Sequence, residues 1–120
     1  MKYSHELFHE ALTELFKQCG VSLRKFARRC KVDYTYLSKL KRGRMPAPSD
    51  EVIRRIAAGF GISPDYFMEY RVRKVSRYLM LKPNLTTALY RLANLPIEVQ
   101  KKIESKIIRA LEKDFLNVPG

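Results

Sequence analysis

The sequence lacks most of the residue groups on which catalytic and metal-binding sites are built. Its two cysteines, Cys19 and Cys30, form neither a C-x-x-C pair nor a metal-binding quartet. It has no glycine-rich phosphate loop, no G-x-S-x-G nucleophile motif and no catalytic cysteine arrangement. We therefore expect no catalytic residue, no metal and no cofactor. We also expect both thiols to stay reduced, at or near the core of a cytoplasmic protein.

Long hydrophobic runs are missing as well. No apolar stretch approaches the roughly 18 residues that a membrane span requires. The first residues, MKYSHELFHE, alternate between polar and apolar side chains, which is not the pattern of a signal peptide. The sequence thus predicts neither a membrane span nor an export signal.

Acidic residues are scarce relative to basic ones. Lys and Arg total 24 against 12 Asp and Glu, which gives a net charge of +12. This excess favours a polyanionic partner, either nucleic acid or an anionic membrane surface. The 120 residues, of which 46% are apolar, suffice for one compact domain or for a small domain with an appendage.

Apolar residues recur at helical spacing along the chain, and no window alternates long enough to predict a sheet. Ser22 and Asp33 are predicted N-caps, and Gly43 and Gly61 are predicted helix ends. The predicted helical segments are 4–19, 22–30, 33–42, 49–61, one that begins at 63, 69–81, 85–94 and 96–115.

The second and third segments are joined only by Lys31 and Val32. Two short helices with so short a connection must meet at a steep angle. This is the helix-turn-helix arrangement, in which the second helix can enter the major groove of DNA.

Residues 24–44, which include most of both helices, carry most of the chain's positive charge. Their nine cations and one acid, Asp33, give +8 of the overall +12. A solvated basic face on an ordinary helical bundle is the alternative, but the two-helix spacing favours DNA binding. The nine cations are Arg24, Lys25, Arg28, Arg29, Lys31, Lys39, Lys41, Arg42 and Arg44.

The stretch GVSLRKFARRCKVDYTYLSKLKRG, followed by PSDEVIRRIAAGFGISPDYF, resembles the lambda-repressor-like (Cro/cI, or XRE) helix-turn-helix family. The resemblance covers about Phe8 to Phe67, a little over half of the chain. It implies a five-helix bundle that binds double-stranded DNA, usually as a dimer on a palindromic operator. The matching positions include Gly20, Ala27, Val32, Leu37, Leu40, Gly43, Pro48, Ser49, Ile56, Ala57, Phe60, Gly61 and Asp65.

Carried over position by position, the resemblance assigns two kinds of DNA contact. It implies base contacts for Tyr34, Thr35 and Lys39. It implies phosphate contacts for Tyr36, Ser38, Arg42 and Arg44; packing at the bundle surface is the alternative for the two tyrosines.

Three positions depart from the family pattern. Leu23 stands where the family often has a phosphate-binding glutamine, so either Arg24 or Lys25 makes that contact instead or the contact is absent. Lys31 stands where the turn usually has glycine, so a left-handed backbone there would be slightly strained. The loop from Arg44 to Pro48 is one residue longer than usual.

The C-terminal segment contains an amphipathic helix that must bury an apolar stripe. The stripe consists of Val99, Ile103, Ile107 and Leu111, with Ala110 beside them. We expect residues 85–120 to form a helical hairpin that dimerises. The alternatives are a cover for the N-terminal bundle, or a grip on a protein partner as in an antitoxin or anti-regulator. The basic run 71–77 either reaches flanking phosphates or forms a solvated linker helix.

One motif points to a different chemistry. His5-Glu6-Leu7-Phe8-His9 matches H-E-x-x-H, in which two histidines one helical turn apart bind zinc. A third ligand would be needed, and the chain has no other histidine. We expect these histidines to flank the core of the first helix.

The sequence therefore predicts an all-α protein: a five-helix lambda-repressor-like bundle followed by a C-terminal helical hairpin. The expected division is 1–68 for DNA binding, 69–84 as a basic linker helix and 85–120 for dimerisation. The predicted function is that of a sequence-specific transcriptional regulator, most simply a dimeric repressor.

Overall fold

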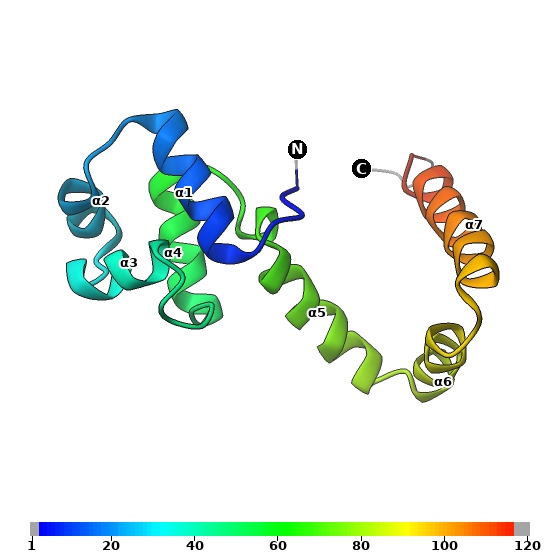
Figure 1. Ribbon diagram of the computed structural model, residues 1–120. Coiled ribbons are helices and arrows are strands. Elements are labelled where there is room, and N and C mark those ends of the chain that lie inside the picture. The colour runs from blue at the N-terminus through cyan, green and yellow to red at the C-terminus, as the bar shows by residue number, and fades with distance from the viewer. Residues whose placement is uncertain (1–2, 117–120) are drawn as a thin grey trace. The chain divides into compact units, whose positions relative to one another are not determined.

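The computed structural model describes residues 3–116, which form seven α-helices and one 3-10 turn without any strand (Figure 1). The predicted all-α class is confirmed. The chain divides into two compact units between Arg77 and Tyr78. The elements are α1 (Phe8–Cys19), α2 (Leu23–Cys30), α3 (Tyr34–Lys41), α4 (Asp50–Phe60), the 3-10 turn η1 (Pro64–Tyr66), α5 (Met68–Met80), α6 (Pro83–Ala93) and α7 (Ile97–Leu116).

Side-chain caps fix the starts of three helices in the first unit. Ser22 Oγ accepts from the Lys25 N–H at 3.2 Å at the start of α2, and Asp33 Oδ2 accepts from the Tyr36 N–H at 3.0 Å at the start of α3. Ser49 caps α4 in the same way. Each cap satisfies a backbone donor that the helix itself leaves unpaired. The caps predicted at Ser22 and Asp33 are confirmed.

The first helix begins later than predicted, at Phe8 and not at Ser4. The Ser4 N–H donates to the Tyr66 carbonyl oxygen at 2.9 Å, which holds the residues before the helix against a distant part of the chain. Leu7 provides no side-chain cap. Instead, Glu69 Oε2 of α5 accepts from the Phe8 N–H at 2.9 Å. A residue 61 positions away thus sets where α1 starts.

The core of the first unit lies among α1 to α4 and Phe67. The core includes the buried Phe16 and Phe26, with the half-buried Phe60 against them; the Phe26 centroid lies 5.0 Å from that of Phe16 and 4.2 Å from that of Phe60. Phe8 packs on Phe67 with 4.7 Å between centroids. Each fully buried side chain of this size contributes about 1.5–3 kcal/mol to folding.

The two cysteines have different environments. Cys30 is buried, and burial raises the pKa of its thiol to about 11, so it stays protonated and unreactive. Cys19 is exposed, so the expectation that it lies at the core is wrong. It is the last residue of α1, next to the left-handed Gly20 that ends the helix.

The second unit contains α6 and α7, joined by Asn94, Leu95 and Pro96. Gln100 Nε2 donates across this connection to the Ala93 carbonyl oxygen at 2.9 Å. None of its described residues is buried. Within the described residues, no helix is long and apolar enough to cross a membrane.

Candidate nucleic-acid interface

The turn between α2 and α3 sets the geometry of the candidate site. Lys31 caps α2 in the left-handed conformation, with φ 58° and ψ 42°. The Val32 N–H then donates back to the Ala27 carbonyl oxygen at 3.0 Å, and the Val32 side chain is buried. A left-handed lysine is strained by about 1–2 kcal/mol relative to glycine. This strain lies at Lys31, where the chain turns from α2 toward α3.

One side of α3 is fixed in the core while the other faces outward. Leu37 and Leu40 are buried, with 0% and 1% of their surfaces exposed. The residues predicted to contact bases, Tyr34, Thr35 and Lys39, are all exposed, Tyr34 to 38%. The structure thus presents these three side chains to solvent from a helix whose opposite face is anchored.

A cation–π contact joins α2 to α3 beside these residues. The Arg24 guanidinium lies over the Tyr34 ring, 4.3 Å from its centroid. This stacking places one predicted phosphate contact directly against one predicted base contact. Lys25, one position further along α2, is exposed.

The remaining predicted phosphate contacts lie along α3 and just beyond it. Arg42 and Arg44 are exposed, and Arg42 Nε donates to the Ser38 carbonyl oxygen at 3.3 Å. Ser38 and Tyr36 are half-buried, and Tyr36 packs against the core. Tyr36 therefore has the packing role that is the alternative to a phosphate contact.

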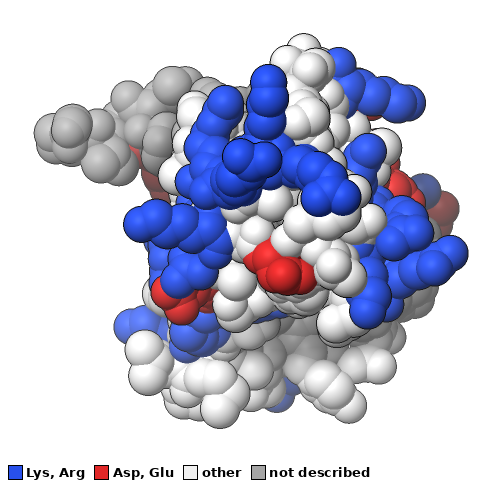
Figure 2. Space-filling model, turned by 90° about the vertical axis from the view of Figure 1, so that its left-hand side faces the viewer, with Lys and Arg blue, Asp and Glu red and all other residues white. Residues whose placement is uncertain are grey.

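Lys and Arg side chains gather on the face that α2 and α3 form (Figure 2). Residues 24–44 contain nine cations and one acidic residue, Asp33. The carboxylate of Asp33 caps α3. Lys41 is turned toward α1, where its ammonium lies 5.4 Å from the Phe16 ring centroid. Its carbonyl oxygen accepts from Thr13 Oγ1 at 3.2 Å. The positive charge of Lys41 therefore lies at the junction between α3 and α1.

Only the last two residues of the H-E-x-x-H pattern, Phe8 and His9, lie on a helix. His5 precedes α1, so the spacing of one helical turn to His9 is lost. A Cβ atom on Gly43 would lie only 2.9 Å from the His9 ring, and Gly43 has φ 73°. His9 therefore packs against the turn that ends α3. Within residues 3–116, no group of three or more potential metal-binding side chains occurs.

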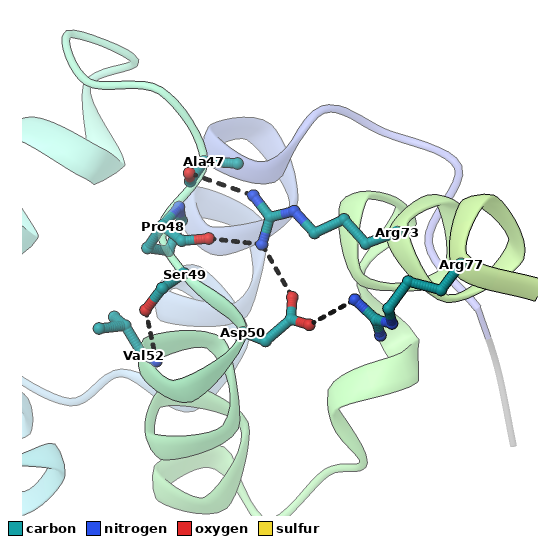
Figure 3. Close-up of polar contacts among 7 residues, drawn as sticks. All are labelled: Ala47, Pro48, Ser49, Asp50, Val52, Arg73 and Arg77. Carbon is teal, nitrogen blue, oxygen red and sulfur yellow. Dashed lines mark hydrogen bonds and ion pairs between the residues drawn. The ribbon is translucent and has the colours of Figure 1, made fainter. Parts of the chain in front are cut away.

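The loop after α3 is tied to α5 by a single arginine (Figure 3). Arg73 donates to the carbonyl oxygens of Pro48 at 2.7 Å and Ala47 at 3.3 Å, and to Asp50 Oδ1 at 2.9 Å. Arg77 donates to the other carboxylate oxygen of Asp50 at 3.2 Å. We call these contacts the Asp50 latch. The latch holds both the end of the loop and the first turn of α4.

Neither role predicted for the basic run 71–77 describes Arg71 and Arg73. Arg71 donates to the carbonyl oxygens of Ser4 at 2.7 Å, Asp65 at 3.0 Å and Tyr66 at 2.9 Å. Both guanidiniums thus bind backbone oxygens of the first unit. The i, i+4 spacing of Arg73 and Arg77 shows that they share a face of the helix, but no sequence pattern indicates Asp50 as their partner.

A bundle that presents a short, capped, outward-facing helix beside a second basic helix defines the helix-turn-helix class of DNA-binding domain. Residues 12–67 match the helix-turn-helix family, and this part of the chain belongs to its Cro/cI (XRE) type, as the resemblance predicted. This match supports a role as a DNA-binding transcription regulator of that type. No curated protein and no solved structure matches the chain.

The Asp50 latch gives a prediction for stability and its pH dependence. Hydrogen bonds from Arg73 and Arg77 hold the pKa of Asp50 below its ordinary value of 3.8. The carboxylate therefore stabilises the fold above that value, and this contribution is lost as the pH falls through the lowered pKa. Asp50→Asn should lower the free energy of unfolding at pH 7 by about 1 kcal/mol.

Urea unfolding at pH 7 and at pH 3 measures this effect. The difference between Asp50→Asn and the unchanged protein should be smaller at pH 3, because below pH 3.8 the unfolded chain takes up a proton that the folded Asp50 resists. Glu51→Gln is the matched control, because it removes the same charge from the next residue, an exposed one. An equal loss in both variants at pH 7 would contradict the latch.

Proposed function

We propose that this regulator is a repressor that binds a palindromic operator as a homodimer, with α3 in the major groove. The observation that carries the proposal is the fixed outward display of Tyr34, Thr35 and Lys39, opposite the buried Leu37 and Leu40. Each protomer covers one half-site, and two half-sites lie about 10 bp apart. Occupation of the operator blocks access to the promoter, in the cytoplasm where its DNA lies.

The three base contacts supply different chemistry. The Lys39 ammonium donates to the O6 and N7 acceptors of guanine, and the Thr35 hydroxyl both donates and accepts. The Tyr34 hydroxyl does the same, while its ring supports Arg24 at 4.3 Å. Tyr34 and Thr35 belong to the first turn of α3, the part of a recognition helix that contacts base edges.

Phosphate contacts on both sides of α3 fix its position in the groove. Arg24 and Lys25, at the start of α2, replace the glutamine that the family often has where this chain has Leu23. Arg42 and Arg44 bind the backbone beyond the other end of α3. Tyr36 and Ser38, which are half-buried, contribute hydroxyl groups from its side.

Dimerisation is assigned to the stripe of α7. Val99, Ile107 and Leu111 are 41%, 39% and 63% exposed, and Ile103 is half-buried. A helix with an apolar stripe is stable when that stripe is covered, and no described residue of the second unit is buried. In this proposal residues 1–68 bind DNA, 69–84 connect, with Glu69, Arg71 and Arg73 also bound to the bundle, and 85–120 dimerise.

Selection of bound sites from a random DNA library tests the proposal as a whole, since it requires an enriched sequence with two-fold symmetry. Within that experiment, Lys39→Ala should change the preferred base at one position per half-site. The lost contact should cost about 1–3 kcal/mol on the original site if it is bidentate. Lys74→Ala, an exposed lysine of α5, is the control and should leave the preference unchanged. An unaltered preference in Lys39→Ala would refute base reading by Lys39.

Arg42→Ala should behave differently, because phosphate contacts carry no sequence information. It should weaken binding to all duplexes alike and lower the slope of log affinity against log salt by about 0.9. Fluorescence anisotropy at several salt concentrations measures this slope. Arg54→Ala removes the same charge from an exposed position on α4. A slope for Arg42→Ala that equals that of the unchanged protein would rule out the contact.

Ile107→Glu should separate the dimer, because it places a charge in the stripe. Sedimentation should then give the mass of one chain, and affinity for a two-half-site operator should fall by roughly 10²–10⁴-fold as avidity is lost. Ser105→Glu changes the charge equally at an exposed polar position and should remain dimeric. If the unchanged protein is itself a monomer at micromolar concentration, the assignment is wrong and the stripe belongs to a different protein partner.

A further inference from the structure

A second basic feature of the first unit lies at the far end of α2 and is not used in the proposed recognition of the operator. A hollow of about 290 Å³ opens between the end of α2 and the C-terminal half of α4. Three cations line it, Arg29, Lys31 and Arg55, together with Cys30, Ala58 and Gly59. We call the three cations the flank surface.

Gly59 lines this hollow and lets α2 and α4 approach each other closely. A Cβ atom at Gly59 would lie 2.5 Å from Cys30 Sγ and 2.8 Å from Phe26 Cζ. Any larger residue would push the end of α2 away from α4. The glycine therefore brings Arg29 of α2 and Arg55 of α4 to one place.

The two arginines bind each other's helix ends. Arg29 Nη1 donates to the Gly59 carbonyl oxygen, and Arg55 Nη1 donates to the Lys31 carbonyl oxygen, each at 3.5 Å. Both bonds are at the limit of hydrogen-bond length, and both side chains are exposed, so they add little stability. They do orient two guanidiniums whose other N–H groups, within residues 3–116, bond only to Glu51.

Glu51 is the acidic residue that would compete with an incoming anion for the flank surface. Its Oε1 accepts from Arg55 Nη2 at 2.7 Å, one helical turn away on α4. Exposed pairs of this kind are weak, so an anion that binds Arg29 and Lys31 as well can displace the carboxylate. A phosphate is suited to that exchange, because a guanidinium can bind it through two parallel N–H bonds.

The course of DNA over a helix-turn-helix domain leads toward this hollow. When α3 lies in the groove, the first helix of the pair crosses the phosphate backbone. Lys25 and Arg29 lie four residues apart, so they share one face of α2 and continue from its start to the flank surface. We infer that Arg29, Lys31 and Arg55 bind backbone phosphates of duplex DNA that flanks the operator. This inference rests on the proposed function, since it needs α3 seated on its site.

An acidic protein segment would also suit three cations, but the observations favour DNA. The flank surface joins the basic face of α2 without an intervening acid, because no acidic residue occurs in α2. A strand already bound at Arg24 and Lys25 therefore meets it next.

The test uses the selected site as two duplexes, one trimmed to the site and one extended by about 15 bp on each side, or one and a half helical turns. Arg29→Ala and Arg55→Ala should bind the trimmed duplex like the unchanged protein. On the extended duplex each should lower the salt slope by about 0.9 and weaken binding several-fold. Glu51→Gln should do the reverse on the extended duplex alone. Arg54→Ala, with the same charge change on α4, should show no dependence on duplex length.

The outcomes separate this inference from the proposed function. If the unchanged protein selects no site, the proposed function fails. If it selects a site but Arg29→Ala and Arg55→Ala bind both duplexes like the unchanged protein, the flank surface does not contact DNA and the inference is overturned. A loss that is equal on both duplexes would also overturn it, since the contact would then lie within the operator. Thermal unfolding of each variant shows that the comparison is made on folded protein.

Discussion

The connection between α2 and α3 is the constraint on which the interface depends. Only Lys31, Val32 and the cap residue Asp33 separate the two helices, and Lys31 must adopt φ 58° to turn the chain. Val32 is buried behind the turn, so the helices cannot pivot without exposing it. The direction of α3, and with it every outward-facing side chain of that helix, follows from this short segment.

The first turns of α5 hold the surroundings of that interface in place. Glu69 caps α1, Arg71 binds the segment before α1 and the η1 turn, and Arg73 binds the loop after α3. These three residues point to different parts of the first unit, yet they lie within five positions of one helix. A helix that looks in the sequence like a basic linker is thus a structural part of the bundle.

Local chemistry explains which features could be predicted from the sequence. Caps at Ser22 and Asp33, the buried Leu37 and Leu40 and the turn at Lys31 all depend on residues within a few positions, so their patterns are visible in one segment. The start of α1, the Asp50 latch and the approach of α2 to Gly59 depend on residues 23 to 61 positions apart. The helical spacing of residues in a sequence does not show which distant carboxylate an arginine will bind. The exposure of Cys19 could not be predicted for a similar reason. Helical spacing shows which residues share a face of a helix but not how far the core extends along that face.

The net charge of the chain is larger than the charge available to DNA, because several cations are engaged within the protein. Arg71 and Arg73 bind carbonyl oxygens of the bundle, Arg77 binds Asp50, and Lys41 lies over Phe16. The cations that remain exposed near α3 are concentrated on α2 and beyond the end of α3. Within α3, two of the three proposed base contacts, Tyr34 and Thr35, are uncharged. Affinity and sequence preference are thus assigned to largely different residues, so that a change in one need not alter the other.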